Sequence, residues 1–172
     1  MRPDDKYSSA RVFFIYFCEK LNYMNLHIKN ETSRLRAVVL GTAESNGPTP
    51  SIEDCYDPKS VENIIAGTYP KEEDMVGEMN AFEKVLKKYD VQVFRPQILK
   101  DVNQIFARDI AFVVEDKFIR SNILPNRIEE LDAIDHVYNQ VASENRIIPP
   151  EEVHVEGGDV MPWNDYIFVG VY

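Results

Sequence analysis

Cysteine and histidine are scarce in this chain of 172 residues, which contains two cysteines and three histidines. Cys18 and Cys55 form no CxxC pair, and His27, His136 and His154 are scattered along the sequence. Structural zinc needs clustered Cys and His ligands, and a disulfide framework needs more cysteines than two. We therefore expect no metal site and no cofactor. A reducing compartment, the cytoplasm, is the simplest location.

Basic residues are also few: the chain has 19 Lys and Arg against 29 Asp and Glu, which gives a net charge of −10. A nucleic-acid partner needs clustered basic side chains for the phosphates. The longest basic cluster is Lys84, Lys87 and Lys88, whose helical spacing is that of a solvated helix face. We expect no nucleic-acid partner.

No apolar run approaches the roughly 18–20 residues that span a bilayer, so we expect no membrane partner. Val12–Cys18 is a run of seven apolar residues, but no small-residue cleavage site follows it, which argues against a signal peptide. Met24 opens a stretch that leads naturally into a first strand. Residues 1–23 are therefore interpreted as an N-terminal extension, either appended or produced by a start codon placed too early; an ordinary N-terminal helix is the alternative.

The chain has enough apolar residues for a packed core, at 44% hydrophobic and 11% aromatic. At roughly 150 residues per domain, its length corresponds to one domain or part of one. The sequence ends in an apolar, β-branched and aromatic stretch, Ile167–Tyr172, with no polar tail. This stretch either closes a sheet or marks a fragment, and the chemistry below favours a fragment.

The first half predicts a strand, a long loop, a helix and a second strand. Met75, Met79, Phe82, Leu86 and Tyr89 are spaced 4, 3, 4 and 3, the stripe of an amphipathic helix. The expected elements are a strand at 36–41, a loop at 42–70 with one or two helical turns near 61–65, a helix at 72–89 and a strand at 91–94.

The second half predicts two further units, each opening with a hairpin. Glu115-Asp116 suits a two-residue turn. The expected elements are strands at 109–114 and 117–120, a helix at 127–142, and a last hairpin at 153–161 and 166–172. A period of about 45–50 residues indicates a structural repeat. Strands alternating with helices indicate an α/β (α+β) class.

Two short carboxylate motifs stand where a loop enters a strand in successive units. They are F-A-R-D-I-A-F at 106–112, and V-E-G-G-D-V-M at 155–161. An acid at such a place is unfavourable unless it is hydrogen-bonded or paired with a cation. Paired glycines allow close backbone approach. Two carboxylates at matching places in a repeat can converge, and a planar guanidinium suits such a pair best.

Each motif also has an ordinary structural interpretation. Asp109 could pair with its neighbour Arg108 or cap a turn, and Gly157-Gly158 could form a bulge or a tight turn. The order, spacing and matched strand context of the two motifs favour a shared pocket, in which Asp109 and Glu156 approach each other.

The sequence resembles the N-terminal part of the guanidino-group-modifying (pentein) superfamily, and within it most of all the glycine amidinotransferases. The resemblance runs from about residue 34 to 172. The segments that resemble the family are L-R-A-V-V-L-G-T-A-E-S-N (35–46), the helix and strand at 69–96, F-A-R-D-I-A-F-V-V (106–114), and V-E-G-G-D-V-M (155–161).

This resemblance implies an α/β-propeller of five ββαβ-type units, of which residues 24–172 hold about three. The family's nucleophilic cysteine lies near its C-terminus, and its histidine, in an H-x-D/E motif, follows the third unit. Neither has a match here: Cys55 lies in the loop after the first strand, and His154 precedes the E-G-G-D motif. This chain alone is therefore expected to be inactive. An incomplete propeller would expose apolar faces, which favours association, so a homo-oligomer is left open.

The resemblance also implies roles for the site residues. Asp109 binds the substrate guanidinium, and Glu156 orients the family histidine and contacts the same guanidinium, so both count as catalytic. The implied substrate-binding residues are Asp109, Arg108, Gly157, Gly158 and, in a supporting role, Asp159. A cysteine thiolate attacks the guanidinium carbon to give a covalent amidino intermediate. The implied partners are a small guanidino substrate, such as arginine, and an acceptor amine.

Three functions remain open at this point. The first two units resemble an amidinotransferase, in which an amine resolves the intermediate. The E-G-G-D motif is the form typical of arginine deiminase-type hydrolases, in which water does so. The third interpretation is a non-catalytic interaction domain with the pentein fold.

Overall fold

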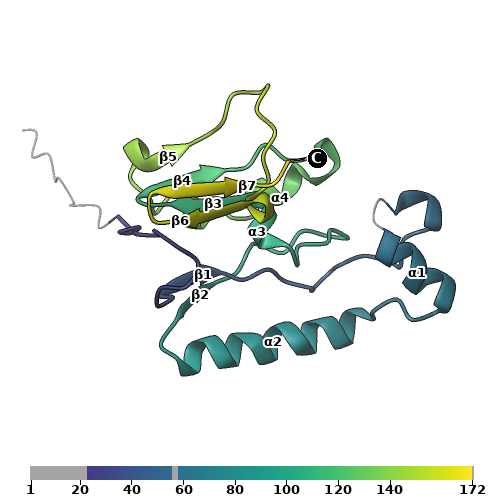
Figure 1. The fold of residues 1–172 in the computed structure, drawn as a ribbon. Coiled ribbons are helices and arrows are strands. Elements are labelled where there is room, and N and C mark those ends of the chain that lie inside the picture. Colours follow the sequence, from purple (N-terminus) through teal and green to yellow (C-terminus); the bar gives the residue numbers. More distant parts are fainter. Residues whose placement is uncertain (1–22, 56–57, 172) are drawn as a thin grey trace, which may run out of the picture.

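The computed structural model describes residues 23–55 and 58–171 (Figure 1). Nearly all of the predicted N-terminal extension, residues 1–22, therefore lies outside the described residues. The described part is a mixed α/β fold with three small sheets, which confirms the predicted class. Within the described ranges the sheets do not close into a propeller.

The first unit is a parallel pair of strands with two helices between them. Strand β1 (Ala37–Val39) pairs with β2 (Gln92–Phe94) in the register Val38 to Val93. Helices α1 (Pro58–Ala66) and α2 (Glu72–Lys88) connect them, after a short 3₁₀ turn, η1 (Ile52–Asp54). Both strands and the long helix were predicted. α2 carries acidic residues in its first turn and lysines in its last, which complements the helix dipole.

Arg95, just after β2, ties α2 to the end of β1. Its Nε and Nη2 atoms donate to Oε2 of Glu83, at 3.0 and 2.7 Å, and its Nη1 donates to the carbonyl of Gly41. Lys87 also donates to the Glu83 carboxylate, at 2.5 Å. Helix α2, which runs along one side of the strands in Figure 1, is thus held by a charged anchor.

This anchor makes stability depend on pH. The hydrogen bonds from Lys87 and then Arg95 hold the pKa of Glu83 below its usual value. A lowered folded-state pKa stabilises the fold above the unfolded-state pKa, and that stability is lost as pH falls through the folded-state value. We expect Glu83→Gln to lower the melting temperature at neutral pH and to have little effect at acidic pH.

Thermal melts followed by circular dichroism measure this effect. Glu78→Gln, at an exposed position of the same helix, is the control. An equal loss in both variants, or a loss that does not change with pH, would contradict the anchor.

The second unit contains the predicted hairpin. Strand β3 (Ala111–Val114) pairs antiparallel with β4 (Lys117–Arg120), and the turn residue Glu115 has φ 52°. A short strand that the sequence did not predict, β5 (Arg146–Ile147), runs parallel to β4. Residues 109 and 110, predicted as strand, instead belong to a four-residue helix, α3 (Ala107–Ile110). The amide of Asp109 donates to the carbonyl of Phe106 at 3.0 Å, so the chain makes a turn there before it extends.

The predicted helix at 127–142 is broken into short pieces, and that prediction is wrong in detail. The pieces are η2 (Pro125–Arg127), α4 (Glu129–Asp132), α5 (Asp135–Tyr138) and η3 (Ser143–Asn145). Ile134, with φ −107° and ψ 8°, interrupts the helix between α4 and α5. Leu131, Ile134 and Val137 are all buried, and their spacing of three suits 3₁₀-like turns as well as an α-helix.

The third unit is a hairpin that starts later than predicted. Strand β6 (Val160–Trp163) pairs antiparallel with β7 (Tyr166–Val169), and a 3₁₀ turn, η4 (Gly157–Asp159), precedes β6. The segment before β1 crosses the ends of these units. The amide of Met24 donates to the carbonyl of Gln140, Ile28 bridges to Glu115, and Asn30 bridges to Trp163.

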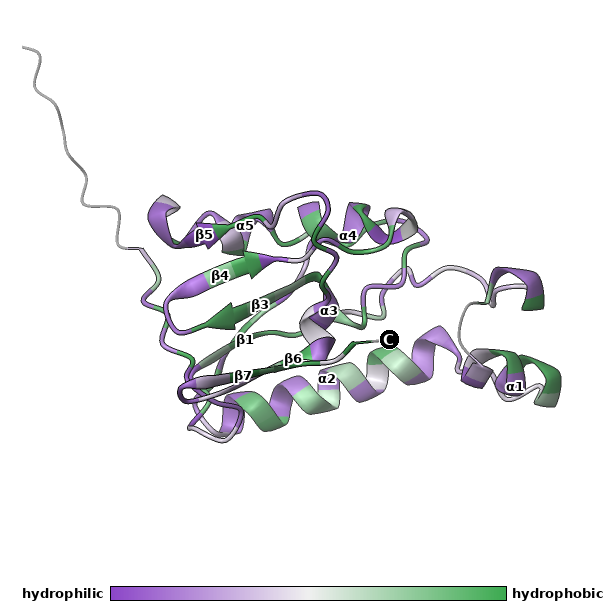
Figure 2. Cartoon of the chain, turned by 45° about the horizontal axis from the view of Figure 1, so that its top comes forward, coloured by the Kyte–Doolittle hydropathy of each residue, from purple (hydrophilic) through white to green (hydrophobic). Residues whose placement is uncertain are grey.

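The core lies between the β3–β4 hairpin and the short helices α4 and α5. The rings of Phe118 and Tyr138 meet edge to face, with centroids 5.3 Å apart. The buried cluster consists of Ile110, Phe118, Ile123, Leu131, Ile134, Val137, Tyr138 and Val141. Figure 2 shows apolar residues along these strands and on the short helices beside them. This core fixes α3 and the Pro125–Arg127 turn relative to each other.

Candidate functional site

The short helical turns that precede the hairpins of the second and third units, α3 and η4, pack against each other. Arg108 joins them: its Nε donates to the carbonyl of Gly157 and its Nη2 to the carbonyl of Val160, each at 2.7 Å. Glu31 pairs with the same guanidinium at 2.9 Å. Arg108 thus aligns the two motifs, and a contact between Arg108 and substrate stays a prediction.

Glycine is needed at the contact between the motifs. A Cβ atom on Gly157 would lie 2.1 Å from the carbonyl oxygen of Arg108, so no larger residue fits without moving the backbone. A Cβ atom on Gly158 would lie 2.7 Å from Oδ1 of Asp109. Gly158 is exposed, and because it has no side chain the Asp109 carboxylate can lie against its backbone.

Asp109 and Glu156 flank one guanidinium nitrogen. Nη1 of Arg127, at the end of η2, lies 3.0 Å from Oδ2 of Asp109 and 4.0 Å from Oε2 of Glu156. The two carboxylates that the sequence singled out thus meet at the same group, although they are 47 positions apart in the chain. The roles assigned to them stay predictions.

Arg127 and Glu130 were not singled out from the sequence. Nε and Nη2 of Arg127 donate to the two carboxylate oxygens of Glu130, at 2.7 and 2.9 Å. The side chain of Glu130 is only 4% exposed and that of Arg127 10%, so the ion pair is buried. The hydrogen bonds that Arg127 donates to Glu130 are the main cause of the raised pKa of Arg127. The sequence did contain one sign of this pair: Arg127 and Glu130 carry opposite charges and are three positions apart, a spacing that brings side chains together on a helical turn.

The surroundings of Glu156 raise the pKa of its carboxyl group. Its burial and then the negative charge of Asp109 raise its pKa, and Arg127 only partly offsets this. The charge of Asp159 also raises the pKa of Glu156 to a smaller extent. Asp159 otherwise faces the chain after β7, since its carbonyl accepts from the amide of Gly170 at 2.9 Å. Its supporting role stays a prediction.

The raised pKa of Glu156 has a measurable consequence. A carboxyl group whose folded-state pKa exceeds its unfolded-state value makes the fold less stable as pH rises through the interval between the two. We therefore expect Glu156→Gln to raise the melting temperature at neutral pH and to lose this advantage at acidic pH. Glu152→Gln, at an exposed position nearby, is the control and should leave the melting temperature unchanged at both neutral and acidic pH. A Glu156→Gln variant that is less stable than the unchanged chain at neutral pH would contradict this prediction. It would show that Arg127 fully offsets the cost of the negative charge on Glu156.

Cys55 and His154 take no part in these contacts. Sγ of Cys55, just after η1, donates to the carbonyl of Ser51 at 3.3 Å, and His154 is exposed in the loop before η4. Among residues 23–55 and 58–171, no group of three or more His, Cys, Asp and Glu side chains is arranged to hold a metal ion. No helix in the described ranges is long and apolar enough to cross a membrane.

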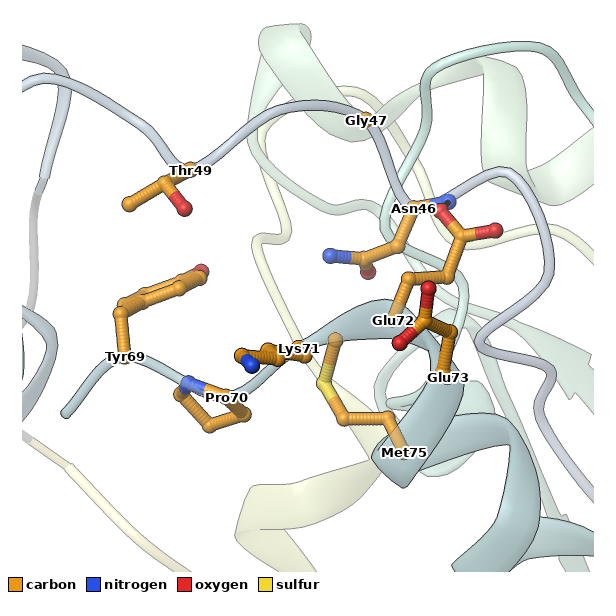
Figure 3. A pocket seen from close by; sticks show the side chains of 9 residues that line it. All are labelled: Asn46, Gly47, Thr49, Tyr69, Pro70, Lys71, Glu72, Glu73 and Met75. Carbon is orange, nitrogen blue, oxygen red and sulfur yellow. Dashed lines mark hydrogen bonds between the residues drawn. The ribbon is translucent and has the colours of Figure 1, made fainter.

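A separate hollow of about 270 Å³ lies where the loop after β1 meets the start of α2 (Figure 3). The Glu72 carboxylate accepts hydrogen bonds from the amides of Ser45 and Asn46, both at 3.1 Å, and so fixes the loop to the helix. The lining residues are Asn46, Gly47, Thr49, Tyr69, Pro70, Lys71, Glu72, Glu73 and Met75. None of the residues around Arg127 lines this hollow.

Comparison with solved structures shows what the fold resembles; no protein-family model and no curated protein sequence matches the chain. SxtG from Microseira wollei, an amidinotransferase of the saxitoxin biosynthetic pathway, superposes with a TM-score of 0.61 at 18% identity. The match covers 84% of this chain and 54% of SxtG. The inosamine-phosphate amidinotransferase StrB1 from Streptomyces griseus gives a TM-score of 0.56 at 16% identity, over 80% of this chain and 53% of StrB1.

A hydrolase is similar to the same extent. The dimethylarginine dimethylaminohydrolase from Pseudomonas aeruginosa gives a TM-score of 0.56 at 14% identity, over 80% of this chain and 50% of the enzyme. The chain therefore spans about half the length of each of these proteins. Its fold is similar to that of both these amidinotransferases and this hydrolase.

Proposed function

We propose that the chain is the N-terminal part of an amidinotransferase-like enzyme that acts on arginine or a related guanidino compound. The observation that carries this proposal is that Asp109 and Glu156, from successive units, flank one guanidinium group. In this proposal, residues 24–172 form about three of five propeller units, and residues 1–23 are an extension.

The charges around Arg127 support a cationic substrate. Asp109, Glu130 and Glu156 surround one arginine, so the group carries a net charge of −2 when all are ionised. Carboxylates bind guanidinium through charge-assisted hydrogen bonds in a planar geometry, which an ammonium ion does not match. The Asp109 side chain is 23% exposed, and its Oδ1, which lies beside Gly158 while Oδ2 accepts from Arg127, is the acceptor assigned to a substrate.

The chemistry proposed for the longer protein has two steps. A cysteine thiolate, supplied by residues outside this chain, attacks the guanidinium carbon, and the amine leaves with a proton delivered by a histidine. An acceptor amine then attacks the amidino carbon and restores the thiol. The contribution of this chain is to bind and orient the guanidinium: Asp109 holds its N–H groups, and Glu156 contacts the same group and orients the histidine.

A hydrolase is the second candidate, and the E-G-G-D motif at 156–159 favours it. In that reaction water, not an amine, resolves the covalent intermediate. A non-catalytic interaction domain is the third candidate, but a cluster of three carboxylates around one arginine fits that function less well.

One experiment separates the three candidates. The longer protein that contains this chain is incubated with arginine labelled with ¹³C at the guanidino carbon, with and without glycine as the acceptor amine. We expect the label to enter a new guanidino compound only when the acceptor is present. Label in citrulline without acceptor would establish the hydrolase, and label that stays in arginine under both conditions would favour the non-catalytic domain.

A further inference from the structure

Glu130 occupies one whole edge of the Arg127 guanidinium. Both of its carboxylate oxygens accept hydrogen bonds, from Nε and Nη2, at 2.7 and 2.9 Å. The two residues are three positions apart, on the adjoining η2 and α4, so the pair forms across a single turn. Because both side chains are almost fully buried, water does not compete for these hydrogen bonds.

With this edge fixed on Glu130, the guanidinium is oriented so that Nη1 is the nitrogen turned toward the other two carboxylates. Asp109 therefore receives a single hydrogen bond from Arg127, at Oδ2 and 3.0 Å, and Glu156 lies 4.0 Å away. The second oxygen of Asp109, Oδ1, faces Gly158 instead of Arg127. A free guanidinium–carboxylate pair prefers two parallel hydrogen bonds, so this single contact is an incomplete one.

An arginine tethered beside a guanidinium-binding carboxylate would compete with the substrate. Its effective concentration is that of an intramolecular partner, far above that of a dilute small molecule. If Glu130 did not fix the orientation of the guanidinium, two of its N–H groups could turn onto both oxygens of Asp109. The binding carboxylate would then be satisfied within the chain and its charge neutralised.

We propose that Glu130 is a positioning residue that holds Arg127 away from full pairing with Asp109 and so keeps Asp109 available to a guanidinium substrate. This inference rests on the proposed function, because it assumes that Asp109 receives a guanidinium. A purely structural role predicts something different. If Glu130 only positions Arg127, replacing both residues should restore the guanidinium binding that is lost when Glu130 alone is replaced.

The test uses the full 172-residue chain and methylguanidinium as the probe, with binding followed by NMR titration. Glu130→Met removes both acceptor oxygens at similar volume, and we expect it to weaken binding by about tenfold or more, as loss of a charge-assisted contact does. The double variant Arg127→Met with Glu130→Met should recover most of this loss, because the internal competitor is gone. Glu129→Met, at the exposed neighbouring position, is the control and should bind as the unchanged chain does.

Circular dichroism establishes that each variant is folded, and Glu130→Gln replaces Glu130→Met if the latter does not fold. Unchanged binding in the single variant, or equal loss in the single and double variants, would overturn the inference. A crystal structure of the single variant provides a readout that does not need the probe: we expect both oxygens of Asp109 to accept from Arg127. If that rearrangement occurs but the unchanged chain binds no methylguanidinium, the positioning is supported and the proposed function fails. If Arg127 keeps its single contact with Asp109, the inference fails.

Discussion

Asp109→Asn should reduce binding of a guanidinium probe to this chain strongly while leaving the fold intact. The change keeps the shape of the side chain and removes the negative charge that pairs with a guanidinium. A charge-assisted hydrogen bond contributes about 1.5–3 kcal/mol, which corresponds to roughly tenfold to hundredfold in affinity. In the longer enzyme that we propose, at least that loss is expected in kcat/KM, since the reacting carbon would also be misplaced.

The fold should tolerate this substitution because Arg127 keeps its buried partner. After Asp109→Asn, both oxygens of Glu130 still accept from Nε and Nη2 of Arg127, so no buried charge is left without compensation. Calorimetric titration with methylguanidinium, beside a thermal melt, separates the two effects, and Asp165→Asn in the exposed β6–β7 turn is the control. A variant that unfolds, with any remaining folded protein binding normally, would make Asp109 a structural residue.

The largest effect on stability is expected from Gly157→Ala. The added methyl group would lie 2.1 Å from the carbonyl oxygen of Arg108, and a backbone atom moves aside less easily than a side chain. Overpacking costs about 1–3 kcal/mol and occasionally more, and we expect the upper end of that range or beyond. For a chain of this size, about 3 kcal/mol lowers the melting temperature by roughly 6–12 °C.

Gly158→Ala is the matched control for that variant. Its methyl group would meet Oδ1 of Asp109 at 2.7 Å, the end of a side chain that can rotate away. We expect a small change in stability and a clear loss of guanidinium binding, because the carboxylate must move. Chemical denaturation of both variants measures the difference. Equal stability losses would show that the contact between Gly157 and α3 is not as close as the structure places it.

The sequence predicted the elements whose residue pattern has one structural solution. The stripe from Met75 to Tyr89 fits only an α-helix, and α2 agrees with the helix predicted at 72–89 to within one residue. The β3–β4 hairpin was likewise predicted, from two short strand-like segments on either side of the two-residue turn Glu115-Asp116. The stripe from Ile128 to Val141 was ambiguous, because buried residues three apart suit short turns as well as a long helix.

The proximity of Asp109 and Glu156 could be inferred from the sequence because the repeat places these two residues at equivalent positions. The participation of Arg127 and Glu130 could not, because it depends on how η2 and α4 pack beside α3, which no local pattern records. The placement of Arg108 has the same origin. Its partners, the carbonyls of Gly157 and Val160, are backbone groups about 50 residues away, and the sequence carries no signal for backbone acceptors.

The central claim is that Asp109 and Glu156 form a site for a guanidinium cation, and carboxyl ¹³C NMR of the full chain tests it directly. The chain is titrated with methylguanidinium and, in parallel, with tetramethylammonium, which has the same charge but no N–H donors. We expect the side-chain carboxyl resonances of Asp109 and Glu156 to shift saturably with methylguanidinium alone. Equal shifts with both cations, or no saturable shift with either, would contradict the claim.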